Sequence, residues 1–507
     1  MKTANRVLVN TIIQYTRLVV NVLVGLVTVR VLLRSLGASD YGLYDVIGGV
    51  IGMLSFISNS LAQTSIRFIS VALGKRDVAA LRKTFNDCFW THLIIGLGLV
   101  FVIEFVGLFI FNGFLNIDPD RVAAAKVVYH CMTAALFLRI FATPFRALVI
   151  AHEDFPFAAS LSIIDSFCKL AIAYVVVFVS QDKLIVYGGL MALINLLNML
   201  LYIAYNFFRY KGELGVERVS TTGLKSVGSF AGWTLLDVLG SLANRQGYAI
   251  MLNKFFGTVT NAVFAIARQV EGHIFTVSSS VIDTMKPQIM KSKGQGDDLR
   301  MLRLSMTAGK FGFSMMSLIA IPLIVMMPDV LTLWLGEAPE GTALFSRLLV
   351  IACLAEQLTR GLVYANQAHG DIKWFSIIVS SIRVSALPIS WIVLSFGAPA
   401  YVAIAIFVLC ETLGSLSRVF VMSHLTGLRI RDFMKSVVLQ ILPPFFLSAL
   451  FCGLLYKALG YSILNMVIVL VLTAAVYAGA LLLFGLTREE RQTIRGILEP
   501  ALNRFRK

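Results

Sequence analysis

Polar and charged side chains recur at helical spacing inside two long apolar stretches of this chain. At about 100° per residue, the polar positions of each stretch share one helix face. A charged group inside a bilayer is costly and usually faces a bundle interior or a wet cavity. The two faces consist of Asn10, Gln14, Arg17, Asn21, Gly25 and Thr28, and of Thr234, Asp237, Ser241, Arg245 and Tyr248.

Arginine outnumbers acidic residues on these faces and on the stretches that follow them. Because arginine grips phosphate with a planar fork of donors, we predict a cavity that binds an anionic headgroup. Three alternatives remain. Some of these polar residues can hydrogen-bond to a neighbouring helix, and Arg268 can pair with Glu271 three residues later. Arg67 can extend its charged end to the membrane surface, that is, snorkel. The candidate substrate-binding residues are Gln14, Arg17, Asn21, Arg67, Ser241, Arg245 and Arg268.

Three acidic residues in the same stretches are candidates for coupling to a proton or a sodium ion. They are Asp237, Glu271 and Asp283. We expect no cofactor and no metal, since the six cysteines are far apart, with no CxxC and no histidine pairing. No P-loop and no nucleophile–base order is present. We therefore predict a transporter rather than an enzyme.

The composition is that of an integral membrane protein. Hydrophobic residues make up 58% of the 507 residues and charged residues 14%, against roughly 25% charged in soluble domains. A helix needs about 20 mostly apolar residues to span a bilayer. The sequence predicts an all-α polytopic fold with 14 spans, at about 8–33, 43–72, 86–112, 123–150, 157–180, 184–208, 225–253, 259–289, 303–327, 343–368, 374–396, 400–425, 436–458 and 462–486.

Lysine and arginine concentrate in alternate loops, which indicates how the chain is oriented. The loops that carry them are expected in the cytoplasm. Both termini then also lie in the cytoplasm, as an even number of spans requires. The basic set includes Lys75, Arg76, Arg82, Lys83, Arg209, Lys211, Lys291, Lys293, Arg300, Arg429, Arg431 and the tail after Arg488.

A weak internal repeat divides the chain. Leu36-Gly37-Ala38 and Gly74 match Phe256-Gly257-Thr258 and Gly294 at one constant offset in residue number, and His152 matches His369 at nearly the same offset. The shift is six spans, so corresponding helices are expected to point the same way through the membrane. We predict two parallel six-helix lobes around a central cavity, with the domains 1–215, 216–428 and, for the last two helices and a basic tail, 429–507.

The order of motifs resembles the multidrug/oligosaccharidyl-lipid/polysaccharide (MOP) exporter superfamily, and within it the polysaccharide transporter (O-antigen flippase) family. The resemblance is carried by Leu36-Gly37-Ala38-Ser39-Asp40-Tyr41-Gly42-Leu43-Tyr44, by Arg67-Phe68-Ile69-Ser70 and by Asn244-Arg245 followed by Gly257 and Phe264-Ala265. Asn244 stands where an aspartate is common, and Phe264 where a tyrosine is common.

The resemblance implies a flippase that moves a polyprenyl-pyrophosphate-linked oligosaccharide from the inner to the outer leaflet by alternating access. It implies a bacterial inner membrane location, contact with membrane lipids and polysaccharide assembly enzymes as candidate partners; no nucleic-acid partner is expected. A lipid II flippase or a cation-coupled drug exporter of the same superfamily is an alternative. A membrane glycan polymerase or ligase is an alternative from a different class.

Overall fold

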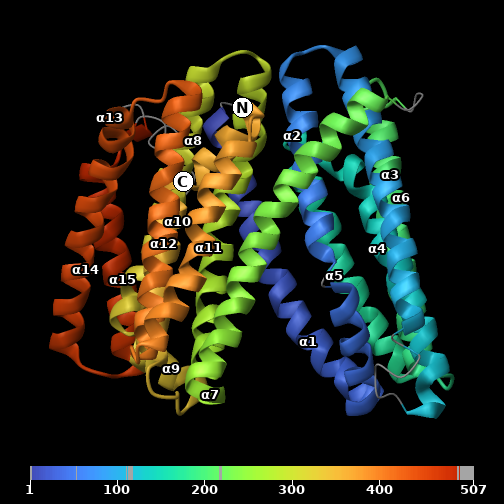
Figure 1. Ribbon diagram of the computed structural model, residues 1–507, viewed down its shortest axis with the longest axis horizontal. Coiled ribbons are helices and arrows are strands. Elements are labelled where there is room, and N and C mark those ends of the chain that lie inside the picture. The colour runs from blue at the N-terminus through green and yellow to red at the C-terminus, as the bar shows by residue number, and fades with distance from the viewer. Residues whose placement is uncertain are drawn as a thin grey trace, which may run out of the picture. The chain divides into compact units, whose positions relative to one another are not determined.

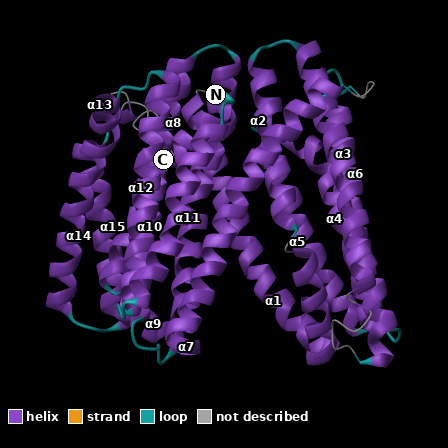
Figure 2. Cartoon of the chain, in the orientation of Figure 1, coloured by secondary structure: helices purple, strands orange, loops and turns teal. Residues whose placement is uncertain are grey.

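The chain is almost entirely helical in its computed structural model, which describes residues 3–52, 54–109, 111, 118–215, 220–487 and 490–491. Within these residues no strand is present (Figures 1 and 2). This agrees with the apolar composition, because helices satisfy every backbone hydrogen bond within the bilayer. The all-α polytopic fold is confirmed.

Two compact units make up the chain, and each has its own core. The N-terminal unit comprises residues 10–235 and 294–296. Within it, α4 packs against α2, α3, α5 and α6. Its helices are α1 (Thr3–Gly52, which begins in the other unit), α2 (Ser55–Gly74), α3 (Val78–Phe109), the short η2 (Pro119–Arg121), α4 (Val122–Ala151), α5 (Phe155–Val177), α6 (Lys183–Arg209) and the start of α7 (Thr221–Gly294).

The C-terminal unit comprises residues 1–9, 236–293 and 297–507. In it α10 packs against α8 and α12, while α14 and α15 pack against α8 (Figure 1). Its further helices are α8 (Asp298–Val325), α9 (Met327–Leu335), α10 (Thr342–His369), α11 (Lys373–Ser395), α12 (Ala400–Thr426), α13 (Ile430–Phe433), η3 (Met434–Val438), α14 (Leu439–Leu459), α15 (Ile463–Ala480) and η4 (Leu481–Gly485).

The repeat seen in the sequence reappears in helix ends and packing. The helices α2 and α7 end at Gly74 and Gly294, and in both halves an aspartate at the matching position caps the next helix. Asp77 accepts from the Ala79 amide at 2.9 Å, and Asp297 accepts from the Arg300 amide at 2.9 Å. The pairings α3–α4, α5–α6 and α4–α6 of one unit recur as α8–α10, α11–α12 and α10–α12 of the other.

Eleven helices in the described part of the chain are long and apolar enough to cross a membrane. The remaining three predicted spans, 43–72, 225–253 and 259–289, fall on α1, α2 and α7. The span 43–72 is divided between α1 and α2, and the two spans on α7 carry many charged residues. None of these three spans therefore has a long uninterrupted apolar window. Fourteen spans are consistent with this structure.

Two local features differ from the sequence prediction. The connection expected between the spans 8–33 and 43–72 is almost absent, because α1 is helical on both sides of the single non-helical residue Gly37. The connection between the predicted spans 303–327 and 343–368 is partly helical. It contains α9, which begins at Met327 and has Pro328 in its first turn.

Candidate functional site

A cavity of about 450 Å³ lies inside the N-terminal unit. Residues from α1, α2, α4, α5 and α6 line it. Its charged lining residues are Arg17, Arg139, Arg146, Lys169 and Asp165, so cations outnumber acids four to one. Polar neutral groups complete the wall, among them Ser58, Asn59, Ser162, Asn195, Asn198 and Tyr202.

The acid in this wall is already neutralised. Lys169 Nζ lies 2.6 Å from the Asp165 carboxylate, one helical turn away on α5. Asn198 on α6 donates to the same carboxylate at 2.7 Å. Residues four apart on one helix lie on the same face, so this pair follows from the spacing in the sequence. The net positive charge of the wall therefore comes from its arginines.

Arg139 and Arg146 stand two turns apart on α4, and both are exposed to the cavity. Neither forms an ion pair with any residue that the structure describes. Arginine donors without an acid partner, set among neutral hydroxyl and amide groups, are suited to bind phosphate. The sequence shows that these two residues lack a partner at helical spacing, but only their common cavity with Arg17 marks them as site residues.

The polar face of α1 divides between the cavity and the helix contacts. Arg17 lines the cavity, while Gln14 is buried. Asn21 donates to the Ser162 hydroxyl at 2.9 Å and accepts from the Ser166 hydroxyl at 2.9 Å. Asn21 therefore joins α1 to α5, which is the helix-to-helix role named as the alternative for such residues.

Arg67 lies outside the lining of this cavity, on α2 of the same unit. Its guanidinium carbon is 4.4 Å from the centre of the Phe68 ring and 4.8 Å from the centre of the Phe230 ring. Such stacking holds a half-buried arginine by its face.

The remaining candidates lie on α7. Arg268 forms an ion pair with Glu271 at 2.6 Å, the alternative given above for two residues three apart on one helix. Arg245 is exposed and forms no ion pair within the described residues. Asp283 accepts a hydrogen bond from the Tyr364 hydroxyl of α10. The side chains of Asp237 and Ser241 lie outside what the structure describes.

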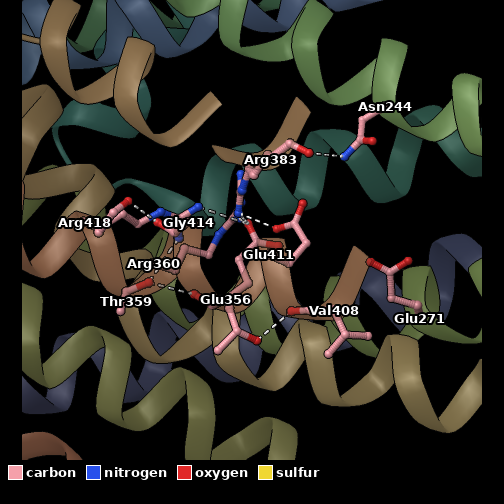
Figure 3. A network of polar contacts seen from close by, with 12 residues as sticks. Asn244, Glu271, Glu356, Thr359, Arg360, Arg383, Val408, Glu411, Gly414 and Arg418 are labelled. Carbon is pink, nitrogen blue, oxygen red and sulfur yellow. Dashed lines mark hydrogen bonds and ion pairs between the residues drawn. The ribbon is translucent and has the colours of Figure 1, made fainter. Parts of the chain in front are cut away.

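A closed ionic network fills the corresponding helices of the C-terminal unit (Figure 3). Glu356 on α10 is within 3.2 Å of Arg360, 3.6 Å of Arg383 and 3.7 Å of Arg418. Arg383 on α11 also bonds Glu411 on α12 at 2.9 Å. The guanidinium of Arg383 thus bridges two partly buried carboxylates and links three helices.

Two small details position Arg383. Gly414 lies against its side chain, since a Cβ there would be 3.2 Å from Arg383 Cγ. Asn244 on α7 donates to the Arg383 backbone carbonyl at 3.3 Å (Figure 3). The sequence gives Glu356–Arg360 as an i, i+4 pair, but the links to α11 and α12 are tertiary and were missed.

The two units therefore treat matched positions differently. The shift in residue number that relates His152 to His369 also relates Arg139 to Glu356. In the N-terminal unit this position supplies to a cavity a cation that forms no ion pair with a described residue. In the C-terminal unit it supplies the acid to which three arginines bind. Among the described residues, the arginines that line this cavity thus lie in the N-terminal unit, while those bound to Glu356 lie in the C-terminal unit.

An ion-pair cluster outside the membrane spans holds one end of that unit. Arg121 lies 2.5 Å from Asp40 and 2.6 Å from Asp182. Burial raises the pKa of Asp182, but the Arg121 hydrogen bond and the amides of Ile185 and Leu184 lower it further, so the net shift is downward. This cluster ties the α1 turn to the starts of α4 and α6.

Comparison with known proteins gives the fold and the family. A MATE protein crystallised in the straight conformation is similar over 83% of this chain and 97% of its own, with a TM-score of 0.70 and 14% identity. The MATE transporter VcmN of Vibrio cholerae in the bent form covers 85% and 98%, with a TM-score of 0.67 and 15% identity.

A third solved structure is a MOP superfamily transporter from Pyrococcus furiosus, described as having a binding pocket of reversed polarity that suggests a different function. It covers 84% of this chain and 96% of its own, with a TM-score of 0.63 and 14% identity. No curated protein matches this chain in sequence. The sequence profile described as "Polysaccharide biosynthesis protein" matches residues 7–287, more than half of the 507 residues. The chain therefore belongs to the polysaccharide biosynthesis protein family of the MOP superfamily, and it has the fold of the MATE transporters.

Proposed function

We propose that the protein is a flippase that moves an oligosaccharide linked to polyprenyl pyrophosphate from the inner to the outer leaflet of the bacterial inner membrane. Its family is one of polysaccharide biosynthesis, and its fold is that of membrane transporters. Both termini are placed in the cytoplasm on the distribution of lysine and arginine. Polysaccharide assembly enzymes are its proposed partners.

The cationic cavity of the N-terminal unit carries this proposal. Arg17, Arg139 and Arg146 bring three positive charges to one cavity whose acid, Asp165, is already paired. A pyrophosphate placed there exchanges its hydration for charge-assisted hydrogen bonds in a low-dielectric wall. The neutral groups Asn59, Asn195 and Tyr202 offer donors and acceptors to the first sugar.

The alternatives differ in how well they suit this cavity. A cation-coupled drug exporter needs acids to hold its substrate, and like charges in the cavity would repel a cationic drug. A glycan polymerase or ligase needs a site for bond making, which the cavity's residues do not suggest. A lipid II flippase carries the same pyrophosphate, so the sugar specificity has to be measured.

Flipping in proteoliposomes tests the proposal directly. We expect a labelled polyprenyl-pyrophosphate oligosaccharide to cross the bilayer at a rate that a cationic dye does not match. Parallel assays with lipid II separate the two flippase readings. Absence of flipping for every pyrophosphate lipid, with the protein folded and correctly inserted, would falsify the proposal.

Cavity variants sharpen that test. Because a hydrogen bond to a charged group contributes about 1.5–3 kcal/mol, Arg17→Ala and Arg139→Ala should each weaken substrate binding roughly 10- to 100-fold. Arg30→Ala is the matched control, since Arg30 is also exposed on α1 but does not line the cavity. In cells, Arg17→Ala should abolish surface polysaccharide while the protein still reaches the membrane. Arg245→Ala tests in the same assay whether the exposed arginine of α7, which is not part of this cavity lining, also takes part.

A further inference from the structure

Lys286 is a buried amine in the C-terminal unit. The residue is 4% exposed, and its Nζ makes no hydrogen bond with any residue that the structure describes. The ring of Tyr364 on α10 lies beside it, with its centre 5.0 Å from Nζ. An unpaired ammonium in such surroundings is strongly unfavourable, so the neutral amine is the form that suits this conformation.

A second buried lysine shows how the same unit treats a permanent charge. Lys310 on α8 is 1% exposed, and its Nζ lies 2.6 Å from Glu490 and 2.5 Å from Gln440. A carboxylate and an amide thus neutralise and solvate that ammonium. Lys286 has neither, although it is as well buried. The contrast marks Lys286 as a lysine whose charge is not fixed by its partners.

The charged and titratable groups that face Lys286 are few. Asp283 lies one turn earlier on α7, is exposed, and accepts from the Tyr364 hydroxyl. Arg360 of α10 is the second charged neighbour, and it also pairs with Glu356 at 3.2 Å. With a neutral amine, the charges of Asp283 and Arg360 cancel locally. A proton on Lys286 adds one positive charge that this packing does not compensate.

We propose that Lys286 takes up and releases the proton that couples transport to a proton gradient. In the conformation described here burial favours the neutral amine. In the alternate conformation the amine reaches water or Asp283, and its lone pair accepts one proton to form an ammonium. The return to the buried state expels that proton to water. The inference deepens the proposed function, on which it rests for the identity of the cargo.

Coupling follows from the difference between the two states. A proton shifts a conformational equilibrium only as far as it binds one state better than the other. A buried amine with no hydrogen-bond acceptor among the described residues binds it poorly, and a hydrated amine beside a carboxylate binds it well. Lys286 therefore has the property that a coupling group needs, whereas the paired Lys310 does not.

A conformational measurement tests this without any cargo. Hydrogen–deuterium exchange of the full-length protein in nanodiscs, corrected for intrinsic rates, is compared in acidic and alkaline buffer. We expect protection of α7 and α10 to depend on pH in the wild type and in Lys310→Met. We expect Lys286→Met to lose that dependence and to resemble the wild type in alkaline buffer. A wild-type pH response that persists in Lys286→Met, or no response in the wild type, overturns the proposal.

Transport supplies a second, separable readout. Flipping of the labelled pyrophosphate lipid is measured with and without an imposed proton gradient. The ratio of the two rates should exceed one in the wild type and in Lys310→Met, and fall to about one in Lys286→Met and Lys286→Arg, since neither side chain releases a proton on burial. Gradient stimulation retained in both Lys286 variants contradicts the role. A pH response without any flipping instead refutes the proposed cargo and leaves Lys286 as a proton site.

Discussion

Gly37 and Gly257 occupy matching positions of the repeat and adopt nearly the same backbone conformation. Gly37 has φ 79° and ψ 168°, and Gly257 has φ 80° and ψ −170°. Each is the single non-helical residue inside a long helix, α1 or α7. This region of φ and ψ is essentially restricted to glycine. The repeat therefore preserves a reversal of the chain that only a residue without a side chain makes easily.

The first prediction concerns this reversal. Gly37→Ala and Gly257→Ala should each destabilise the protein by about 1–3 kcal/mol, because alanine is strained at that φ and ψ. Among the described residues beyond the adjoining backbone, nothing lies within 4 Å of the Cβ position at either glycine, so the loss is one of backbone strain rather than of a clash. Unfolding in detergent measures it. Gly25→Ala is the control: it lies on regular helix with open space and should be neutral or slightly stabilising.

The second prediction concerns the ionic network of the C-terminal unit. Arg383→Met removes the 2.9 Å partner of the partly buried Glu411 and should cost about 3 kcal/mol of stability, the low end for a buried pair. Adding Glu411→Gln should recover part of that loss, because the uncompensated charge is then gone. A double-mutant cycle by thermal unfolding gives the coupling. Strictly additive losses would contradict a direct pair. Arg303→Met, at an exposed position, should change little.

The third prediction concerns the ion pair between Arg121 and Asp182. The pKa of Asp182 is lowered in the folded protein, so its charge contributes stability that is fully present above the unfolded value of about 4 and is lost as the pH falls through the folded pKa. Asp182→Asn keeps the cap of the α6 amides but removes the charge. Its melting temperature should lie below that of the wild type at neutral pH and converge on it in acid.

Asp118→Asn is the matched control for this pH profile. Asp118 also caps a helix, through the Asp120 amide, but forms no ion pair in the described part of the chain. Its melting temperature should show no such convergence. An Asp182→Asn profile parallel to that of the wild type at every pH would show that the pair with Arg121 adds nothing to stability.

The fourth prediction concerns the two C-terminal helices. The sequence places 429–507 outside the repeat, so deletion of this segment should impair transport less than deletion of a core pair of helices. The structure adds a condition, because Gln440 and Glu490 are the partners of the buried Lys310. Truncation leaves an unpaired ammonium in α8, and Lys310→Met in the truncated chain should restore folding yield and melting temperature. No gain from that second substitution would mean that other contacts, such as the packing of Cys452 and Tyr477, decide the loss.

Much of the architecture was accessible from local patterns. Long apolar stretches set the helices, and the matched glycines at 37 and 257 marked both the repeat and the two chain reversals. Pairs within one helix were also readable, since Asp165–Lys169 and Arg268–Glu271 lie at the spacing at which helical neighbours meet. The exact ends of the helices could not be predicted from the sequence, because a helix as short as α9 and a reversal at a single glycine carry little hydropathy signal.

The site residues show the limit of such patterns. Polar residues at helical spacing identify one face of a helix, but they do not identify the helix or cavity against which that face lies. Arg17 lines a cavity, whereas Asn21 on the same stripe bonds to α5. Arg139 and Arg383 look alike in sequence, each an arginine without an acid at helical spacing. Arg139 forms no ion pair among the described residues and lines a cavity, and Arg383 bridges two glutamates.

The sequence by itself determined that this protein is a helical membrane protein with a duplicated core. The length of an apolar stretch and the position of a glycine that interrupts a helix are local properties, set by residues close together in the chain. Only the tertiary structure decided which arginines line a cavity and which are neutralised by glutamates, and which of two buried lysines has a carboxylate partner. Those outcomes depend on side chains from helices far apart in the chain. The stability and accessibility of a charged side chain in a bilayer depend on the residues that folding places beside it, and the local sequence pattern does not identify those residues.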